Sequence, residues 1–230
     1  MIGIAIGAMV LGITEVPKPV LAFPLDGKVI SPVEVTWRDG SKIIPCPRGV
    51  AIEIKGDSGW MVPDDPKFVI TKALTISAWI KPEYYVTNGP AGQVLFRGDD
   101  RNGLDPYQMC LHSDGKIAFG VQDDKGKSAS LECDVPLHLW THVMGTYDAK
   151  EKELKLYING KLFDQVEAKL SVLGFLDPKS HPGIGVGNIQ WNGGPHNQPF
   201  HGVIADLRLY NVALTPKDVQ FRPEGWNDPF

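Results

Sequence analysis

The stretch LWTHVMGTYDAKEKELKLYINGKLF, residues 139–163, carries the strongest structural signal in the chain. Its segment ELKLYI (153–158) alternates aliphatic side chains with charged or aromatic ones. That period of two is typical of a half-buried antiparallel strand. The dipeptide Asn159-Gly160 then supplies the two positive-φ residues that a type I′ turn requires. The stretch therefore predicts a β-hairpin whose second strand follows residue 160.

Two further segments show the same kind of pattern, LTISAWIKP (74–82) and PFHGVIADLRLYNVALTPKDV (199–219). Together with 139–163 they resemble laminin-G-like domains of bacterial type in the concanavalin A-like lectin and glucanase superfamily. The family patterns are W-x-H-V-A-x-x-Y-D, Y-x-[DN]-G-K and F-T-I-S-A-W-V-K-P, and the resemblance covers about residues 20–220. It implies an all-β fold, a two-sheet antiparallel jelly-roll β-sandwich. Since this fold serves lectins, glycosidases and adhesion modules, it does not select a function.

The remaining strands are expected from alternation and turn residues. We expect about fourteen, including a first strand at 20–27, a hairpin over 49–63, a meander over 93–97, 107–112, 116–123 and 128–135, and last strands at 183–188 and 201–211. Thr215 and Pro216 predict the N-cap and first residue of a short C-terminal helix. The domains are then 1–22, a signal peptide or anchor remnant; 23–222, one jelly roll; and 223–230, a tail.

The N-terminal segment MIGIAIGAMVLGI (1–13) is an apolar run too short for a membrane span. Val20-Leu21-Ala22 offers small residues for signal cleavage, although no Lys or Arg precedes the run and Glu15 follows it. We expect an export signal or anchor remnant, and hence a bacterial protein that is secreted or in the cell envelope. An ordinary leading segment is the alternative.

Composition limits the kinds of partner that the protein can bind. The net charge is −4 and the Lys and Arg residues are scattered, which argues against nucleic acid. The three cysteines, 46, 110 and 133, form no metal-ligand spacing. Cys110 and Cys133 are expected two strand spacings apart, roughly 9–10 Å, which is too far for a disulfide. All three are predicted to be free thiols.

No catalytic set is evident. Glycosidases need two carboxylates that flank the scissile bond, and family members place them as E-x-D-x-E on one strand. The nearest match is Glu132-Cys133-Asp134, followed by Pro136 where the third acid is expected. Glu151 and Glu153 lie beside a turn among lysines. We predict that these acids are solvated and that the protein is not an enzyme.

No nucleophile or metalloprotease motif is present either. His142 occupies the family's W-x-H position within a strand, where a packing or hydrogen-bonding role is expected. Trp79 and Trp140 also occupy family positions and are predicted to be core aromatics.

The resemblance raises the question of calcium, because many family members hold Ca²⁺ through a motif like G-x-I-D-[DE]-V-R. Here Ala205 replaces the first acid, and Asp206 is expected on the opposite side of the sheet, paired with an arginine. We therefore predict no cofactor. Asp26 and Asp206 are the calcium candidates under the alternative.

Two loops could recognise a ligand. NIQWNGGPHNQPFHG (188–202) surrounds an aromatic ring with amides, which suits the C–H face and hydroxyls of a sugar. The alternative is that its tryptophan packs against the sandwich. FRGDDRNGLDPY (96–107) adds acidic rim contacts and contains Arg97-Gly98-Asp99, a tripeptide that integrins recognise but that also arises by chance. The predicted ligand residues are Trp191, Asn192, His196 and Asn197, with Asp99 and Asp100 at the rim.

The leading hypothesis is a non-catalytic module that binds carbohydrate or a cell-envelope component. One alternative is a protein-interaction or structural module of a larger envelope assembly. Another is a divergent polysaccharide hydrolase or lyase whose acids come from separate strands.

Overall fold

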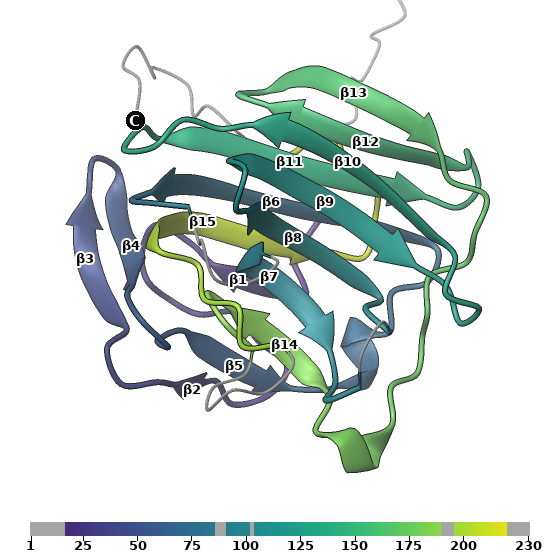
Figure 1. The fold of residues 1–230 in the computed structure, drawn as a ribbon, viewed down its shortest axis with the longest axis horizontal. Coiled ribbons are helices and arrows are strands. Elements are labelled where there is room, and N and C mark those ends of the chain that lie inside the picture. Colours follow the sequence, from purple (N-terminus) through teal and green to yellow (C-terminus); the bar gives the residue numbers. More distant parts are fainter. Residues whose placement is uncertain (1–16, 86–90, 102–103, 190–195, 220–230) are drawn as a thin grey trace, which may run out of the picture.

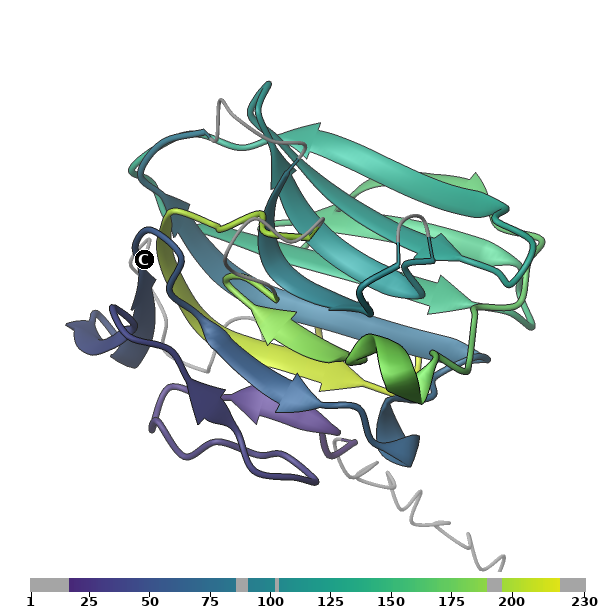
Figure 2. The ribbon, with the colours of Figure 1, turned by 60° about the horizontal axis from the view of Figure 1, so that its bottom comes forward.

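The computed structural model describes residues 17–85, 91–101, 104–189 and 196–219. Two antiparallel sheets lie face to face (Figures 1 and 2), which confirms the predicted jelly-roll sandwich. The strands of the described residues are β1 (Leu21–Phe23), β2 (Thr36–Trp37), β3 (Lys42–Cys46), β4 (Gly49–Ile54), β5 (Trp60–Pro63), β6 (Ala73–Pro82), β7 (Ala91–Gly98), β8 (Tyr107–His112), β9 (Lys116–Gln122), β10 (Ser128–Asp134), β11 (Thr141–Asp148), β12 (Glu153–Ile158), β13 (Lys161–Glu167), β14 (Gly183–Val186) and β15 (Gly202–Tyr210). Two 3₁₀ helices, η1 (Pro66–Phe68) and η2 (Pro178–Ser180), lie in the connections.

The larger sheet has the order β13-β12-β11-β6-β15-β4-β3, and β1 also pairs with β15. The smaller sheet has the order β10-β9-β8-β7-β14-β5-β2. In the larger sheet, β4 pairs with residues 202–204 of β15 and β1 pairs with residues 207–209. A bulge between these two regions, where Asp206 has φ 47°, separates the two partners.

The hairpin predicted at 159–160 is present. Asn159 has φ 50° and Gly160 has φ 73°, as a type I′ turn requires. The Asn159 side chain also accepts a hydrogen bond from the backbone N of His142 at 3.0 Å. This bond ties the turn to β11, so the family motif is stabilised by tertiary contact as well as by local conformation.

The hairpin predicted over residues 49–63 is wrong. Both strands exist, but β4 belongs to the larger sheet and β5 to the smaller one. The turn between them carries the chain from one layer to the other, and Gly59 (φ 149°) packs so closely that a Cβ there would lie 2.6 Å from the carbonyl O of Val186. Alternation identified the strands but could not identify their partners.

The predicted C-terminal helix is also corrected. Residues 216–219 form a turn, in which the backbone N and Oγ1 of Thr215 both donate to the Asp218 carboxylate at 2.7 Å. The side-chain contact expected at a helix N-terminus is therefore made without a helix in the described residues.

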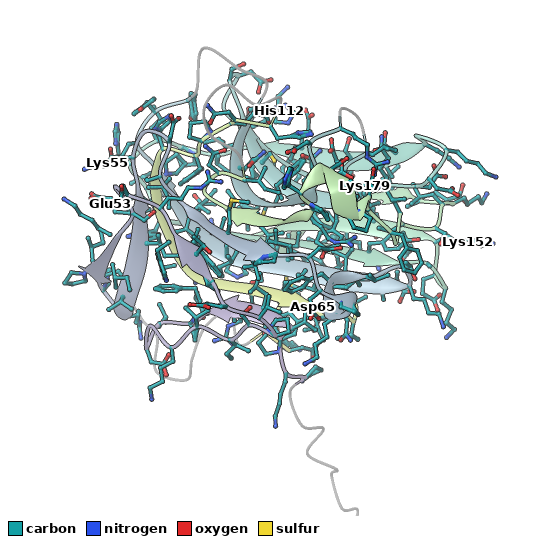
Figure 3. The ribbon with its side chains drawn as sticks, turned by 90° about the horizontal axis from the view of Figure 1, so that it is seen from below. Glu53, Lys55, Asp65, His112, Lys152 and Lys179 are labelled. Carbon is teal, nitrogen blue, oxygen red and sulfur yellow. The ribbon has the colours of Figure 1, made fainter. Side chains whose placement is uncertain are left out.

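The core fills the space between the sheets. Phe119 of β9 and Leu156 of β12 are among its fully buried members, and Gly145 of β11 provides the room that the aromatic ring needs. A Cβ at residue 145 would lie 2.1 Å from Cγ of Phe119. Glu53 and Lys55 lie at one end of the molecule and Lys152 at the other (Figure 3).

All three cysteines are free, as predicted. Cys110 pairs in register with Ala118 and Cys133 with Ile117, so β9 separates the two thiols. Among the described residues, no helix is long and apolar enough to cross a membrane.

Candidate functional site

The outer face of the smaller sheet carries a polar depression over β8, β9 and β10, which lie side by side in Figure 1. Register places Gln108, Gly120 and Ser130 in one row across the three strands, and Gln122 opposite Ser128 in the next row. The depression has a volume of about 180 Å³. Its lining consists of Asp105, Gln108, Gly120, Val121, Gln122, Ser128, Ala129 and Ser130.

Gly120 lowers the floor of this depression. A Cβ at residue 120 would meet Ala129 O and Ser130 Cβ at 3.6 Å, so the fold would accept a methyl group there. Because Gly120 has no side chain, the polar side chains of its neighbours Gln108 and Ser130 surround its backbone. The resulting surface offers side-chain amides and hydroxyls, each of which both donates and accepts hydrogen bonds.

Asp105 borders the depression on the side of the 188–202 loop. Its Oδ1 is buried, accepts no hydrogen bond within the described residues, and lies 4.0 Å from Nε2 of His196. Burial raises the pKa of the Asp105 carboxyl, while the nearby His196 opposes the shift. The backbone N of Asp105 donates to Oε1 of Gln122 at 2.9 Å, which orients that amide.

The buried side-chain amide of Gln93 contacts the 188–202 loop at two positions, Ile189 and His196. Gln93 of β7 is fully buried, and its Oε1 accepts from the backbone N of Ile189 at 2.7 Å. Its Nε2 donates to the carbonyl O of His196 at 3.2 Å. Arg38 also donates to the carbonyl O of Ile189. The two ends of segment 190–195 are therefore fixed beside β7, next to the depression.

The predicted sugar ligands of this loop divide into two groups. Trp191 and Asn192 lie outside the described residues. His196 is buried against Phe96, with ring centroids 4.9 Å apart, and its Nε2 lies 2.9 Å from the carbonyl O of Arg101. Asn197 accepts a hydrogen bond from Asn188 at 2.7 Å. His196 and Asn197 therefore make contacts within the protein that help to hold the loop in place.

Asp99 does not form the predicted rim contact, because its side chain is fully buried. It accepts from Arg101 Nε at 2.9 Å and Nη2 at 2.5 Å, and from the backbone N of Asp177 at 3.3 Å. Burial alone would favour the neutral acid, but these donors keep the pKa of Asp99 below its usual value. Since Arg97 is buried too, the tripeptide 97–99 is not presented to a partner.

Asp100 is exposed, as predicted for a rim residue, but it lies beside η2. Its Oδ2 is 2.8 Å from Nδ1 of His181, which follows η2. The backbone N of Asp100 also donates to the carbonyl O of Ser180 in η2 at 2.8 Å.

The calcium candidates are engaged with their own neighbours. Asp206 binds Arg208 through Nε at 2.9 Å and Nη2 at 2.8 Å, which confirms the predicted arginine pairing. Ala205 is buried beside Trp79. Asp26 accepts from the backbone N of Lys28 at 3.0 Å. The described ranges contain no group of three or more His, Cys, Asp or Glu residues arranged to hold a metal ion.

His142 has the packing position that the sequence predicts. It is buried, its Nε2 lies 3.0 Å from Oγ of Ser77, and its ring packs edge-on against Trp79 at 5.3 Å. Burial lowers the pKa of His142 to about 3, so the ring is neutral at physiological pH. Trp140 is partly buried and packs against the cluster formed by Ala51, Trp79, Val203 and Ala205.

The acids of β10 are exposed, in agreement with the sequence prediction. Glu132 and Asp134 alternate with the buried Leu131 and Cys133. Oε1 of Glu132 lies 3.9 Å from Nδ1 of His112, the last residue of β8, which is labelled in Figure 3.

Sequence reasoning missed Gln108, Gly120, Gln122, Ser128 and Ser130. The available signal was that three successive strands each place small or amide-bearing residues on one face. These residues become neighbours only through the register between the strands, which the sequence alone does not predict.

Comparison with known proteins fixes the class. Residues 55–220 match a laminin G model described as the concanavalin A-like lectin/glucanases superfamily, and the chain belongs to this family. No curated protein matches the chain significantly.

Solved structures extend the fold comparison. The binding domain of Paraclostridial mosquitocidal protein 1 is 17% identical with a TM-score of 0.65, covering 88% of this chain and 51% of that one. The binding domain of botulinum neurotoxin DC in complex with SialylT is 18% identical with a TM-score of 0.64, covering 87% and 50%. A structure concerning botulinum neurotoxin type C and two ganglioside molecules is 15% identical with a TM-score of 0.61, covering 87% and 50%. The chain thus spans about half the length of these structures, and at these identities they show a common fold.

Proposed function

We propose that this protein is a non-catalytic carbohydrate-binding module whose site is the depression over β8, β9 and β10. The observation that carries the proposal is the convergence of Gln108, Gln122, Ser128 and Ser130 around the bare backbone of Gly120. Amides and hydroxyls can pair with the hydroxyls of a sugar in either direction. A shallow site suits a glycan that lies along the sheet.

The neighbouring loop supports the proposal. Its ends are fixed by Gln93, and its intervening segment contains Trp191. An indole ring beside a polar depression would cover the apolar C–H face of a sugar. Of the similar structures, one is a botulinum neurotoxin binding domain in complex with SialylT, and another concerns a neurotoxin whose cell entry depends on two ganglioside molecules. Both support glycan recognition on this fold.

The absence of catalysis is part of the proposal. Asp105 is the one carboxylate among the described residues that line the depression, whereas glycoside hydrolysis commonly requires two. We place the protein in the bacterial envelope or outside the cell, following the expectation of an export signal or anchor in the N-terminal apolar segment. Cleavage after Ala22 is not part of this proposal, because Leu21 and Ala22 are buried in β1.

Replacing Gln108 by Ala should weaken glycan binding about five- to tenfold, since it removes roughly 1 kcal/mol of hydrogen bonding. The measurement is isothermal titration of the full chain with glycans that a polysaccharide panel identifies; the full chain is used because Leu21 and Ala22 are buried in β1. Gln165→Ala, on the exposed strand β13, is the matched control and should leave affinity unchanged.

Trp191→Ala should abolish retention of the same glycans with little change in melting temperature. Unchanged affinity in both Gln108→Ala and Trp191→Ala would refute this site. Loss of several degrees in melting temperature with binding intact would assign Trp191 to packing.

A further inference from the structure

Resting on the proposed function, we infer that the depression selects uncharged glycans and rejects glycans that carry carboxylates. The selection depends on the charge of the ligand, and the site is the depression already described. It follows from the charges on this face of the smaller sheet and from the engagement of the basic groups around it.

The lining itself has one charged side chain, and that side chain is acidic. Asp105 is 22% exposed, and the other polar lining groups are amides and hydroxyls. No lysine or arginine is among the described residues that line the depression. A sugar carboxylate placed there would find no cation and would be repelled by Asp105.

The adjoining part of the same face carries two carboxylates, and Lys116 lies opposite one of them, Asp134, in register. Glu132 and Asp134 project from β10 beside Ser130, in the alternation that places all three on the outer side. An extended glycan that runs along β10 would meet these carboxylates next.

Three basic groups in this part of the molecule already have partners. Arg101 is bound to the buried carboxylate of Asp99. Lys116 lies 3.1 Å from Asp114, and Lys127 donates to the carbonyl O of Lys169 at 2.7 Å. Recruiting any of these cations to an acidic sugar would break an existing contact, whereas a neutral sugar needs none of them.

Hydroxyl groups also match the acceptor that the site provides. A carboxylate accepts hydrogen bonds and does not donate them, so the exposed part of the Asp105 carboxylate can accept from a donor on the ligand. Sugar hydroxyls supply that donor, and ionised sugar carboxylates do not. The same residue thus favours neutral glycans and disfavours acidic ones.

The test uses pairs of probes that differ in charge: lactose and sialyllactose, hydroxyethylcellulose and carboxymethylcellulose, and methyl-esterified and de-esterified polygalacturonate. In each pair that binds, we expect the neutral member to bind at least tenfold tighter at low salt. Asp105→Asn should narrow the difference, and so should high salt, because screening weakens repulsion. Asp164→Asn, on the exposed strand β13, is the matched control and should leave the difference unchanged.

The outcomes separate this inference from the proposed function. An acidic member that binds as tightly as its neutral partner, with loss in Gln108→Ala, would overturn the charge selection and leave the site in place. A preference that persists unchanged in Asp105→Asn would overturn the role given to Asp105. If none of the probes binds the folded protein, the proposed function fails and the inference fails with it.

Discussion

Replacing Asp64 by Ala should lower the free energy of unfolding by about 3–5 kcal/mol, because it leaves a buried guanidinium without its counter-charge. Arg97 of β7 has no exposed surface, and its Nε and Nη2 donate to the two carboxylate oxygens of Asp64 at 3.0 Å each. Nη2 also donates to the carbonyl O of Gly174 at 3.0 Å. The guanidinium lies 5.8 Å from the ring centroid of Tyr107. One carboxylate therefore compensates most of the charge that folding removes from water.

Urea denaturation at neutral pH measures this effect. Asp164→Ala, which removes an exposed carboxylate on β13, should change the free energy by less than about 0.5 kcal/mol. The double variant Asp64→Leu with Arg97→Met should recover much of the loss, since apolar replacements of a buried ion pair are often tolerated. A loss below about 1 kcal/mol in Asp64→Ala would show that water reaches the guanidinium and that the pair is not structural.

Acidification from pH 7 to pH 5 should cost about 2 kcal/mol of stability through His142 alone. Burial holds the pKa of His142 near 3 in the folded protein, against an ordinary value of 6.5. The unfolded chain therefore binds a proton below about pH 6.5 that the folded chain does not bind until about pH 3. Stability that is present above pH 6.5 is lost as the pH falls through this window.

His142→Gln should remove most of this slope, measured as unfolding free energy against pH, whatever its effect at pH 7. Burial also lowers the pKa of His201, so part of the wild-type slope will persist in the variant. His138→Asn is the matched control, because residue 138 is exposed with φ 62°, a conformation that Asn tolerates. Equal slopes in wild type and His142→Gln would contradict the buried, neutral state of this ring.

The sequence was most informative where structure is local. The turn at Asn159-Gly160 and the alternation of β12 specify a hairpin without reference to the rest of the chain. The segment 49–63 has the same local appearance, yet its two strands belong to different sheets. Local pattern determines whether a strand forms, whereas the packing of the two layers determines its neighbours.

The candidate site follows the same division. An aromatic residue among amides was visible in the sequence around residue 191, but Gln108, Gly120 and Ser130 meet only through the register of three strands. Asp99 was misjudged as a rim contact because nothing in the sequence states that Arg101 folds back onto it. Exposure and lateral neighbours are tertiary properties, so the sequence pattern alone does not predict them.

The most direct test of the carbohydrate-binding site is a titration of ¹⁵N-labelled protein with the tightest-binding neutral oligosaccharide of the panel, followed by amide chemical shifts. We expect the largest shifts on Gln108, Gly120, Gln122 and Ser130, and on segment 188–202. Shifts confined to the outer face of the larger sheet, around Trp79 and Val203, would contradict it.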